Sequence, residues 1–137
     1  MIVCVDTNVL LGMFGRASPL LPLRHALSAG HFVWALSTEI MLEYEEVTTR
    51  EFGAVAAERM TRFFQVLDET RGVIRYVSPT FRFHLITADP DDDKFADCAI
   101  TANADFLITE DRHFRPLAGS GYKPQPITPK QFIERCL

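Results

Sequence analysis

The 137-residue sequence predicts an α/β protein with a central parallel sheet. Short apolar runs, typical of buried strands, alternate along the chain with longer segments of helical periodicity. Such alternation indicates a three-layer α/β/α sandwich, in which helices cover both faces of the sheet. No internal repeat, low-complexity tract or linker interrupts the pattern, so residues 1–137 are expected to form a single domain.

The expected strands are short, and each is followed by a helical segment. Four apolar runs predict them: Ile2–Val5, Phe32–Leu36, Val73–Val77 and Phe106–Ile108. Apolar spacing of three to four residues predicts the helices Leu20–Ala29, Thr38–Thr49, Ala54–Glu69 and Asp91–Asn103. The C-terminal ITPKQFIERCL predicts a last short strand, then a helix that Pro129 opens.

The composition is that of a globular protein, with 47% hydrophobic and 23% charged residues. The three cysteines, Cys4, Cys98 and Cys136, form no CxxC pair and fit a reducing compartment. The N-terminal residues lack the basic region of a signal peptide, and no apolar run could span a bilayer. We therefore expect a cytoplasmic protein without a membrane partner.

The net charge of −4 argues against a general nucleic-acid binder, which would normally be basic. A role on nucleic acid would require the acidic residues to be concentrated at a metal site. It would also require the arginines to form local patches.

Two acidic residues follow predicted strands directly. Asp6 ends the first strand, and Asp111 lies just past Phe106–Ile108. Ligands of open α/β sheets bind outside the carboxyl ends of the strands, so both carboxylates are candidates for a shared site. The alternative is structural: Asp6 would cap the following helix and Asp111 would start a turn.

A third candidate lies on the helix that Ser37 is suited to cap. Glu39, Glu43 and Glu46 form an acidic stripe, separate from the apolar stripe of Ile40, Met41, Tyr44 and Val47. Periodicity favours a solvated face and does not single out Glu43.

The run DPDDDKFADCAI holds the remaining candidates. Asp89 can cap a helix whose first turn holds Pro90, and Asp91–Asp93 would complement the helix dipole. Dipole capping does not explain Asp97. Asp93 and Asp97 share one face at i and i+4, where their charges repel unless water or a cation screens them.

Converging carboxylates indicate a divalent cation. Two carboxylates about 4 Å apart repel by ~4 kcal/mol at an effective dielectric constant of ~20. Mg²⁺ and Mn²⁺ suit oxygen ligands, whereas no His/Cys pair has the spacing of a zinc site. Among the scattered histidines, only His113 lies near a candidate, Asp111. Such a site suits phosphodiester hydrolysis, and no Ser/His/Asp triad or phosphate-binding glycine loop is evident.

Four segments in order, CVDTNVLL, STEIMLEYEEV, DPDDDKFADCAI and ADFLITEDRHF, resemble the PIN-domain family. The closing ITPKQFIERCL resembles the VapC-like branch, the toxins of toxin–antitoxin systems. The resemblance spans essentially the whole chain. It implies a Mg²⁺- or Mn²⁺-dependent endoribonuclease that acts on RNA, pairs with an antitoxin protein and forms a homodimer in many members.

The resemblance also assigns roles to residues. The acids fall on Asp6, Glu43, Asp97 and Asp111, with Asp93 as an auxiliary ligand. Asn8 and Thr109 would support the site, and the candidate phosphate contacts are Arg16, Arg112 and Arg115. Glu110 departs from the pattern, because relatives often carry a small or basic residue there; its charge could weaken metal binding or the approach of RNA.

Two other functions stay open at this stage. Asp6 at a strand end could be the nucleophile of an aspartyl phosphotransferase or phosphatase. Those enzymes usually carry a second Asp two residues on, where this chain has Asn8. A non-catalytic module that binds RNA or protein is the other alternative, and the negative net charge and Glu110 favour it.

Overall fold

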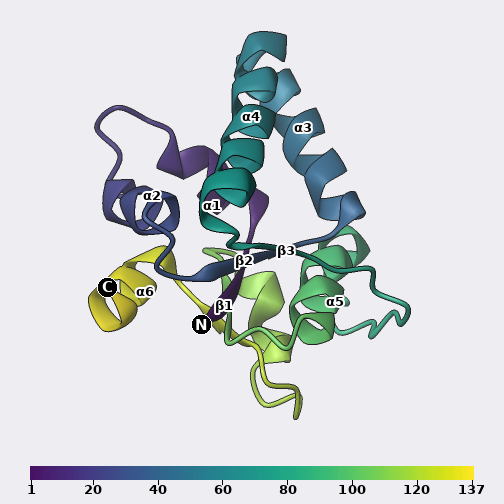
Figure 1. Ribbon diagram of the computed structural model, residues 1–137. Coiled ribbons are helices and arrows are strands. Elements are labelled where there is room, and N and C mark those ends of the chain that lie inside the picture. The colour runs from purple at the N-terminus through teal and green to yellow at the C-terminus, as the bar shows by residue number, and fades with distance from the viewer.

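A five-stranded parallel sheet forms the centre of the computed structural model, which describes residues 1–137 (Figure 1). The strand order is β3-β2-β1-β4-β5. The strands are β1 (Ile2–Val5), β2 (Val33–Leu36), β3 (Ile74–Tyr76), β4 (Phe106–Ile108) and β5 (Gln125–Ile127). All four neighbouring pairs are parallel. The predicted parallel α/β fold is therefore confirmed.

The helices agree with the expected ones apart from their ends and two additions. They are α1 (Thr7–Met13), α2 (Leu21–Ser28), α3 (Thr38–Phe52), α4 (Ala54–Arg71), α5 (Asp93–Thr101) and α6 (Pro129–Cys136). The helix expected over 91–103 is divided, because Asp89 caps a 3₁₀ turn, η1 (Pro90–Asp92), and α5 starts only at Asp93. A second 3₁₀ helix, η2 (Arg112–Leu117), and α1 were not among the predicted helices.

The order of the strands reverses at the centre of the sheet. From β1 the chain proceeds outward through β2 and β3, then returns to β4 on the other side of β1. Because parallel crossovers are right-handed, the two directions place their helices on opposite faces. Figure 1 shows α3 and α4 on one side of the sheet. The carboxyl ends of β1 and β4 thus meet at a topological switch point, where ligands of such sheets bind.

Aromatic side chains fill the core between the sheet and the helical pair α3–α4. The Trp34 ring centroid lies 4.7 Å from that of Phe64 and 6.3 Å from that of Tyr44, and all three side chains are fully buried. Tyr44 also donates a hydrogen bond to the carbonyl oxygen of Val5. This packing fixes α3 against the carboxyl end of β1.

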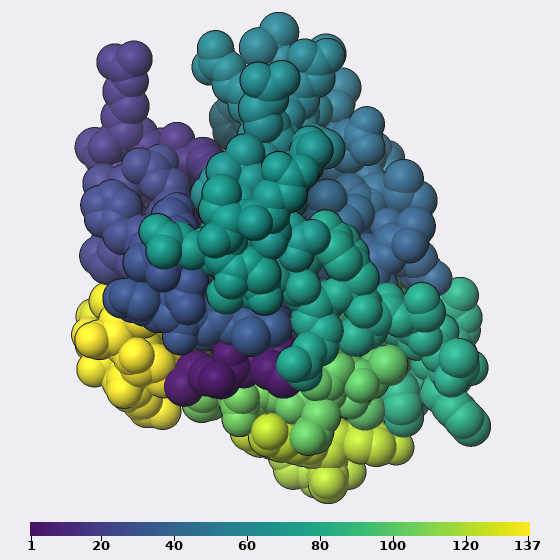
Figure 2. Space-filling view, viewed as in Figure 1, coloured from purple at the N-terminus to yellow at the C-terminus, as the bar shows by residue number.

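Helices α3 and α4 form a hairpin that projects from the rest of the molecule (Figure 2). Gly53 alone separates them, with φ of 91° and ψ of 171°. This conformation is open to glycine and strained for other residues, so the reversal depends on Gly53.

Cys4 and Cys98 are buried free thiols. None of the helices is long and apolar enough to cross a membrane.

Asp105 secures the opposite, amino-terminal edge of the sheet. Its Oδ2 accepts a hydrogen bond of 2.8 Å from the backbone N–H of Ile2, and its Oδ1 lies 3.2 Å from Lys123 Nζ. The hydrogen bond from Ile2 is the main reason that the pKa of Asp105 lies below its usual value.

We predict that Asp105→Ala lowers the free energy of unfolding by about 1–2 kcal/mol near neutral pH, since a charge-assisted hydrogen bond is lost from a side chain that is 32% exposed. Because the folded-state pKa is lowered, this stability is present above the unfolded pKa of about 3.9 and is lost as the pH falls through the folded pKa. Urea denaturation at neutral and acidic pH measures both effects. Glu134→Ala, an exposed acid, is the control, and an equal loss in both variants would contradict the prediction.

Candidate metal site

Asp6 lies at the switch point between β1 and β4 and is buried. Its Oδ1 accepts from the N–H of Thr7 (2.8 Å), and its Oδ2 accepts from Thr109 Oγ1 (2.9 Å). Burial raises the pKa of Asp6, the hydrogen bonds oppose this, and repulsion from Asp111 and Glu43 adds to it. Asp6 is the predicted helix cap of α1, and its charge also interacts with those of the nearby acids Asp111, Glu43 and Asp92.

Asp111 reaches the same place from the end of β4. The Thr109 hydroxyl accepts from the N–H of Asp111 (2.9 Å), while Asp111 Oδ1 accepts from the N–H of His113 (2.9 Å) and so caps η2. Thr109 therefore links Asp6 to the turn that carries Asp111. The supporting role predicted for Thr109 is consistent with this position.

Glu43 is the member of its acidic stripe that points to the cluster. Its side chain accepts hydrogen bonds from the Thr7 hydroxyl and from Lys94 Nζ, the latter at 2.9 Å. Burial by itself lowers the pKa of Lys94, but the hydrogen bond and attraction to Glu43 outweigh it and raise the pKa. Glu39, in contrast, is exposed and pairs with Arg82. Sequence periodicity could not make this distinction.

Asp92 is the acidic residue of the cluster that the sequence analysis missed. Its Oδ2 is buried and has no hydrogen-bond partner. Burial, then repulsion from Asp6, Asp89, Asp111 and Glu43, raises its pKa to about 7. Dipole capping seemed to account for Asp92, and only the fold brings it to the other acids. The position of Asp92 between two identical neighbours offered no signal that could have selected it.

A cation would resolve the repulsion among these groups. Ligand atoms of Asp92, Asp111 and His113 all lie within 4.8 Å of one another. His113 Nδ1 is 3.4 Å from Asp111 Oδ1 and 3.9 Å from Asp92 Oδ2. Carboxylate ligands favour Mg²⁺ or Mn²⁺, and the unpartnered buried oxygen of Asp92 is the kind of atom that such an ion would satisfy. The donor set therefore fits the predicted cofactor.

Asp93 and Asp97 belong to a different set of contacts. Asp97 Oδ1 accepts from the N–H of Phe83 (3.0 Å), and Asp93 Oδ1 accepts from the N–H of Ile86 (2.9 Å). Burial raises the pKa of Asp97, and its charged neighbours are Asp93, Arg82 and His84 rather than Asp6 or Asp111. The structure thus brings Asp6, Glu43 and Asp111 together but does not bring Asp97 to them. Asp93 and Asp97 instead hold the segment between β3 and η1 through these hydrogen bonds to its backbone.

The other predicted residues lie at the surface. Asn8 is exposed and its side chain makes no hydrogen bond, whereas the hydroxyls of Thr7 and Thr109 donate to Glu43 and Asp6. Arg112 and Arg115 are exposed on η2, next to Asp111. Arg16 is exposed and lies beyond the C-terminal end of α1, whereas Asp6 caps the N-terminal end of that helix. Glu110 is exposed and forms no ion pair.

The family model of the PIN domain matches residues 2–113, which include Asp6, Glu43, Asp92 and Asp111. The chain therefore belongs to the PIN domain family. No curated protein matches the chain by sequence.

Solved structures show the same fold at low sequence identity. VapBC2 from Rickettsia felis, bound to a DNA fragment from their promoter, is similar with a TM-score of 0.62 and 16% identity, over 92% of this chain and 98% of that one. VapBC-1 from nontypeable Haemophilus influenzae is similar with a TM-score of 0.56 and 17% identity, again over 92% and 98%. The predicted PIN-like α/β/α architecture is thereby confirmed.

We predict that Asp92→Asn stabilises the metal-free protein by about 1–2 kcal/mol at slightly alkaline pH, because it removes a charge that is 16% exposed and repelled by Asp6, Asp111 and Glu43. The same substitution should abolish most of the stabilisation that Mg²⁺ or Mn²⁺ gives the wild type. Thermal unfolding in chelator and in excess metal measures both.

Asp91→Asn is the matched control, since Asp91 is exposed one residue away. A metal-dependent rise in melting temperature that is as large in Asp92→Asn as in the wild type would exclude Asp92 from the site.

Proposed function

We propose that the chain is a metal-dependent endoribonuclease that hydrolyses RNA phosphodiester bonds. The observation that carries the proposal is the convergence of four carboxylates, Asp6, Glu43, Asp92 and Asp111, at the switch point of a PIN-domain sheet. Asp92 replaces the predicted Asp97 as the fourth acid. Mg²⁺ or Mn²⁺ is the proposed cofactor, which would supply an activated water and neutralise charge on the phosphate.

The protein side chains have separable roles in this proposal. Asp6, Asp111 and Asp92 would hold the ion, with His113 at the exposed rim. Thr7 and Thr109 fix the orientation of Asp6 before any ion binds, which lowers the cost of ordering the site. Lys94 neutralises Glu43 and so limits the negative charge that a phosphate would meet. Arg112 and Arg115 are candidate phosphate contacts.

The proposal extends to a toxin of a toxin–antitoxin pair in the cytoplasm. The similar structures are of VapBC proteins. This chain carries apolar surface that a partner could cover, including the exposed Phe14, Phe52 and Val55. A hollow of about 640 Å³ lies between α1 and the α3–α4 hairpin, lined by residues that include Leu11, Phe14, Phe52, Val55 and Met60. We assign this hollow to the cognate antitoxin. A homodimer is a further expectation, drawn from the family resemblance.

The decisive experiment is cleavage of a structured RNA by the purified protein with Mg²⁺ or Mn²⁺. Asp6→Asn and Asp92→Asn should each reduce the rate by about 100-fold or more, because each removes a ligand of the ion. Asp91→Asn should cleave like the wild type. Asp97→Asn should lose less than about tenfold, since an asparagine oxygen can still accept from the N–H of Phe83.

Equal cleavage by the wild type, Asp6→Asn and Asp92→Asn would contradict the nuclease proposal and favour a non-catalytic module. A loss in Asp97→Asn as large as that in Asp6→Asn would instead restore Asp97 as a metal ligand.

Inducible expression in a bacterial host tests the toxin role. The wild type should arrest growth, and Asp6→Asn should not. Co-expression of the small gene adjacent to the coding sequence should relieve the arrest if it encodes the antitoxin. Normal growth with active, soluble wild-type enzyme present would contradict a toxin role while leaving the nuclease activity intact.

A further inference from the structure

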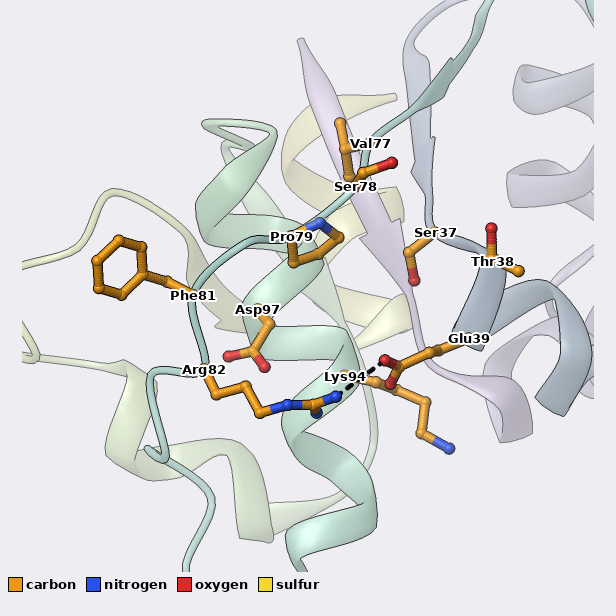
Figure 3. A pocket seen from close by; sticks show the side chains of 10 residues that line it. All are labelled: Ser37, Thr38, Glu39, Val77, Ser78, Pro79, Phe81, Arg82, Lys94 and Asp97. Carbon is orange, nitrogen blue, oxygen red and sulfur yellow. Dashed lines mark hydrogen bonds and ion pairs between the residues drawn. The ribbon is translucent and has the colours of Figure 1, made fainter.

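A polar cleft of about 180 Å³ lies beside the acidic cluster and has no role in the proposed metal chemistry. Its walls come from the start of α3, the segment after β3 and one side of α5 (Figure 3). The residues that matter for its chemistry are Ser37, Glu39, Ser78, Phe81, Arg82 and Asp97. An engineered cavity of about 150 Å³ holds benzene, so the cleft has the size for one aromatic ring.

The outer wall of the cleft is held in place although it has no regular secondary structure. Asp97 binds the backbone N–H of Phe83, and Asp93 binds that of Ile86, whose side chain is buried. Two half-buried or buried carboxylates are thus used to hold one segment of chain. The cleft is therefore preformed, and a ligand need not order it.

The rim of this wall presents aromatic rings to solvent. Phe81 is 71% exposed, and its ring centroid lies 6.1 Å from that of Phe83, which in turn lies 5.0 Å from that of Tyr122. Exposed aromatic rings next to positive charge are the usual means by which proteins stack unpaired bases. Figure 3 shows the Phe81 ring at the edge of the cleft, pointing away from the other side chains that line it.

The polar groups of the cleft suit a nucleotide. Asp97 is 3% exposed, and its Oδ2 accepts no hydrogen bond from the protein. A carboxylate in this position accepts from the exocyclic amino group of a base, as it does with cytosine. Arg82 is paired only with the exposed Glu39, at 3.3 Å. Such surface pairs are weak, so the guanidinium remains available to a phosphate.

The cleft and the acidic cluster adjoin one another through α5 and Lys94. Lys94 lines the cleft while donating to Glu43 of the cluster. Asp97 lies five residues from Asp92 of the cluster, the N-cap of α5, which corresponds to roughly 7.5 Å along the helix axis. A single RNA strand could therefore occupy both places at once.

We propose that this cleft binds one unpaired base of the RNA strand whose phosphodiester lies at the acidic cluster. Phe81 stacks on the base, Asp97 accepts from its exocyclic amino group, and Arg82 contacts the adjacent phosphate. The cleft thus selects a base that carries an exocyclic amino group, which cytosine, adenine and guanine have, over uracil at one position of the substrate. The inference rests on the proposed ribonuclease function, but its test does not require cleavage.

The test is a titration of the full-length ¹⁵N-labelled protein with CMP, AMP and UMP, followed by backbone amide chemical shifts. These monophosphates contain no phosphodiester bond to hydrolyse. We expect shifts in residues 77–83 and at Lys94 and Asp97, and binding of CMP and AMP about fivefold or more tighter than that of UMP. Phe81→Ala should weaken CMP binding at least about fivefold.

Two further variants complete the test. Val66→Ala is the control, because Val66 is 49% exposed on α4 and lines neither the cleft nor the hollow assigned to the antitoxin. Asp97→Asn retains an oxygen for Phe83 and replaces the free oxygen by an amide donor. It should therefore lose the preference for CMP over UMP while the amide shifts of Phe83 and Ile86 stay near their wild-type positions.

Shifts confined to the acidic cluster, equal effects of Phe81→Ala and Val66→Ala, or no nucleotide binding would overturn the proposal. If the wild type cleaves RNA but the cleft binds no nucleotide, this inference fails and the ribonuclease stands. If the cleft binds CMP and no RNA is cleaved, the ribonuclease proposal fails and nucleotide binding by the cleft stands. Loss of antitoxin binding in Phe81→Ala, with nucleotide binding unchanged, would assign the cleft to a protein partner and also overturn the proposal.

Discussion

The hydrogen bonds of Asp6 join the carboxyl ends of the two central strands, and the acidic cluster depends on this junction. The N–H of Asp6 donates a hydrogen bond to the carbonyl oxygen of Ile108 at 3.0 Å. The Asp6 carboxylate accepts a hydrogen bond from the hydroxyl of Thr109, at the end of β4. The Thr109 hydroxyl oxygen in turn accepts a hydrogen bond from the backbone N–H of Asp111. One residue therefore sets the end of β1, the start of α1 and the turn after β4, so the positions of the acids follow from the sheet itself.

The energetic consequence of this geometry is an unbalanced negative charge. Asp6, Glu43, Asp92 and Asp111 repel one another in a partly buried place, and of the four only Glu43 pairs with a lysine or arginine, Lys94. Two such carboxylates about 4 Å apart repel by roughly 4 kcal/mol at an effective dielectric constant of ~20. A divalent cation bound at these carboxylates would remove this repulsion, and this is the physical argument for proposing one.

Residues at the start of helix α5 have two different roles, although they lie within a few positions of one another. Asp92 at its cap and Lys94 in its first turn face the cluster, while Asp93 and Asp97 bind the backbone of the segment that leads into η1. The arrangement follows from helix geometry, because residues at i and i+4 share a face and their neighbours do not. An acidic run that looks uniform in sequence thus contributes to the candidate metal site on one side and to the wall of a cleft on the other.

Local patterns in the sequence sufficed for the parallel α/β fold, the caps at Ser37 and Asp89, and the strand-end positions of Asp6 and Asp111, because these depend on periodicity and neighbouring residues. Local patterns could not choose Glu43 from its stripe or Asp92 from its run, nor reveal that Asp97 anchors a loop. Those choices depend on contacts between residues far apart in the chain, such as Lys94 with Glu43 and Asp97 with Phe83. Only the packing of α3 and α5 around the switch point decided which carboxylates share their charge with Asp6.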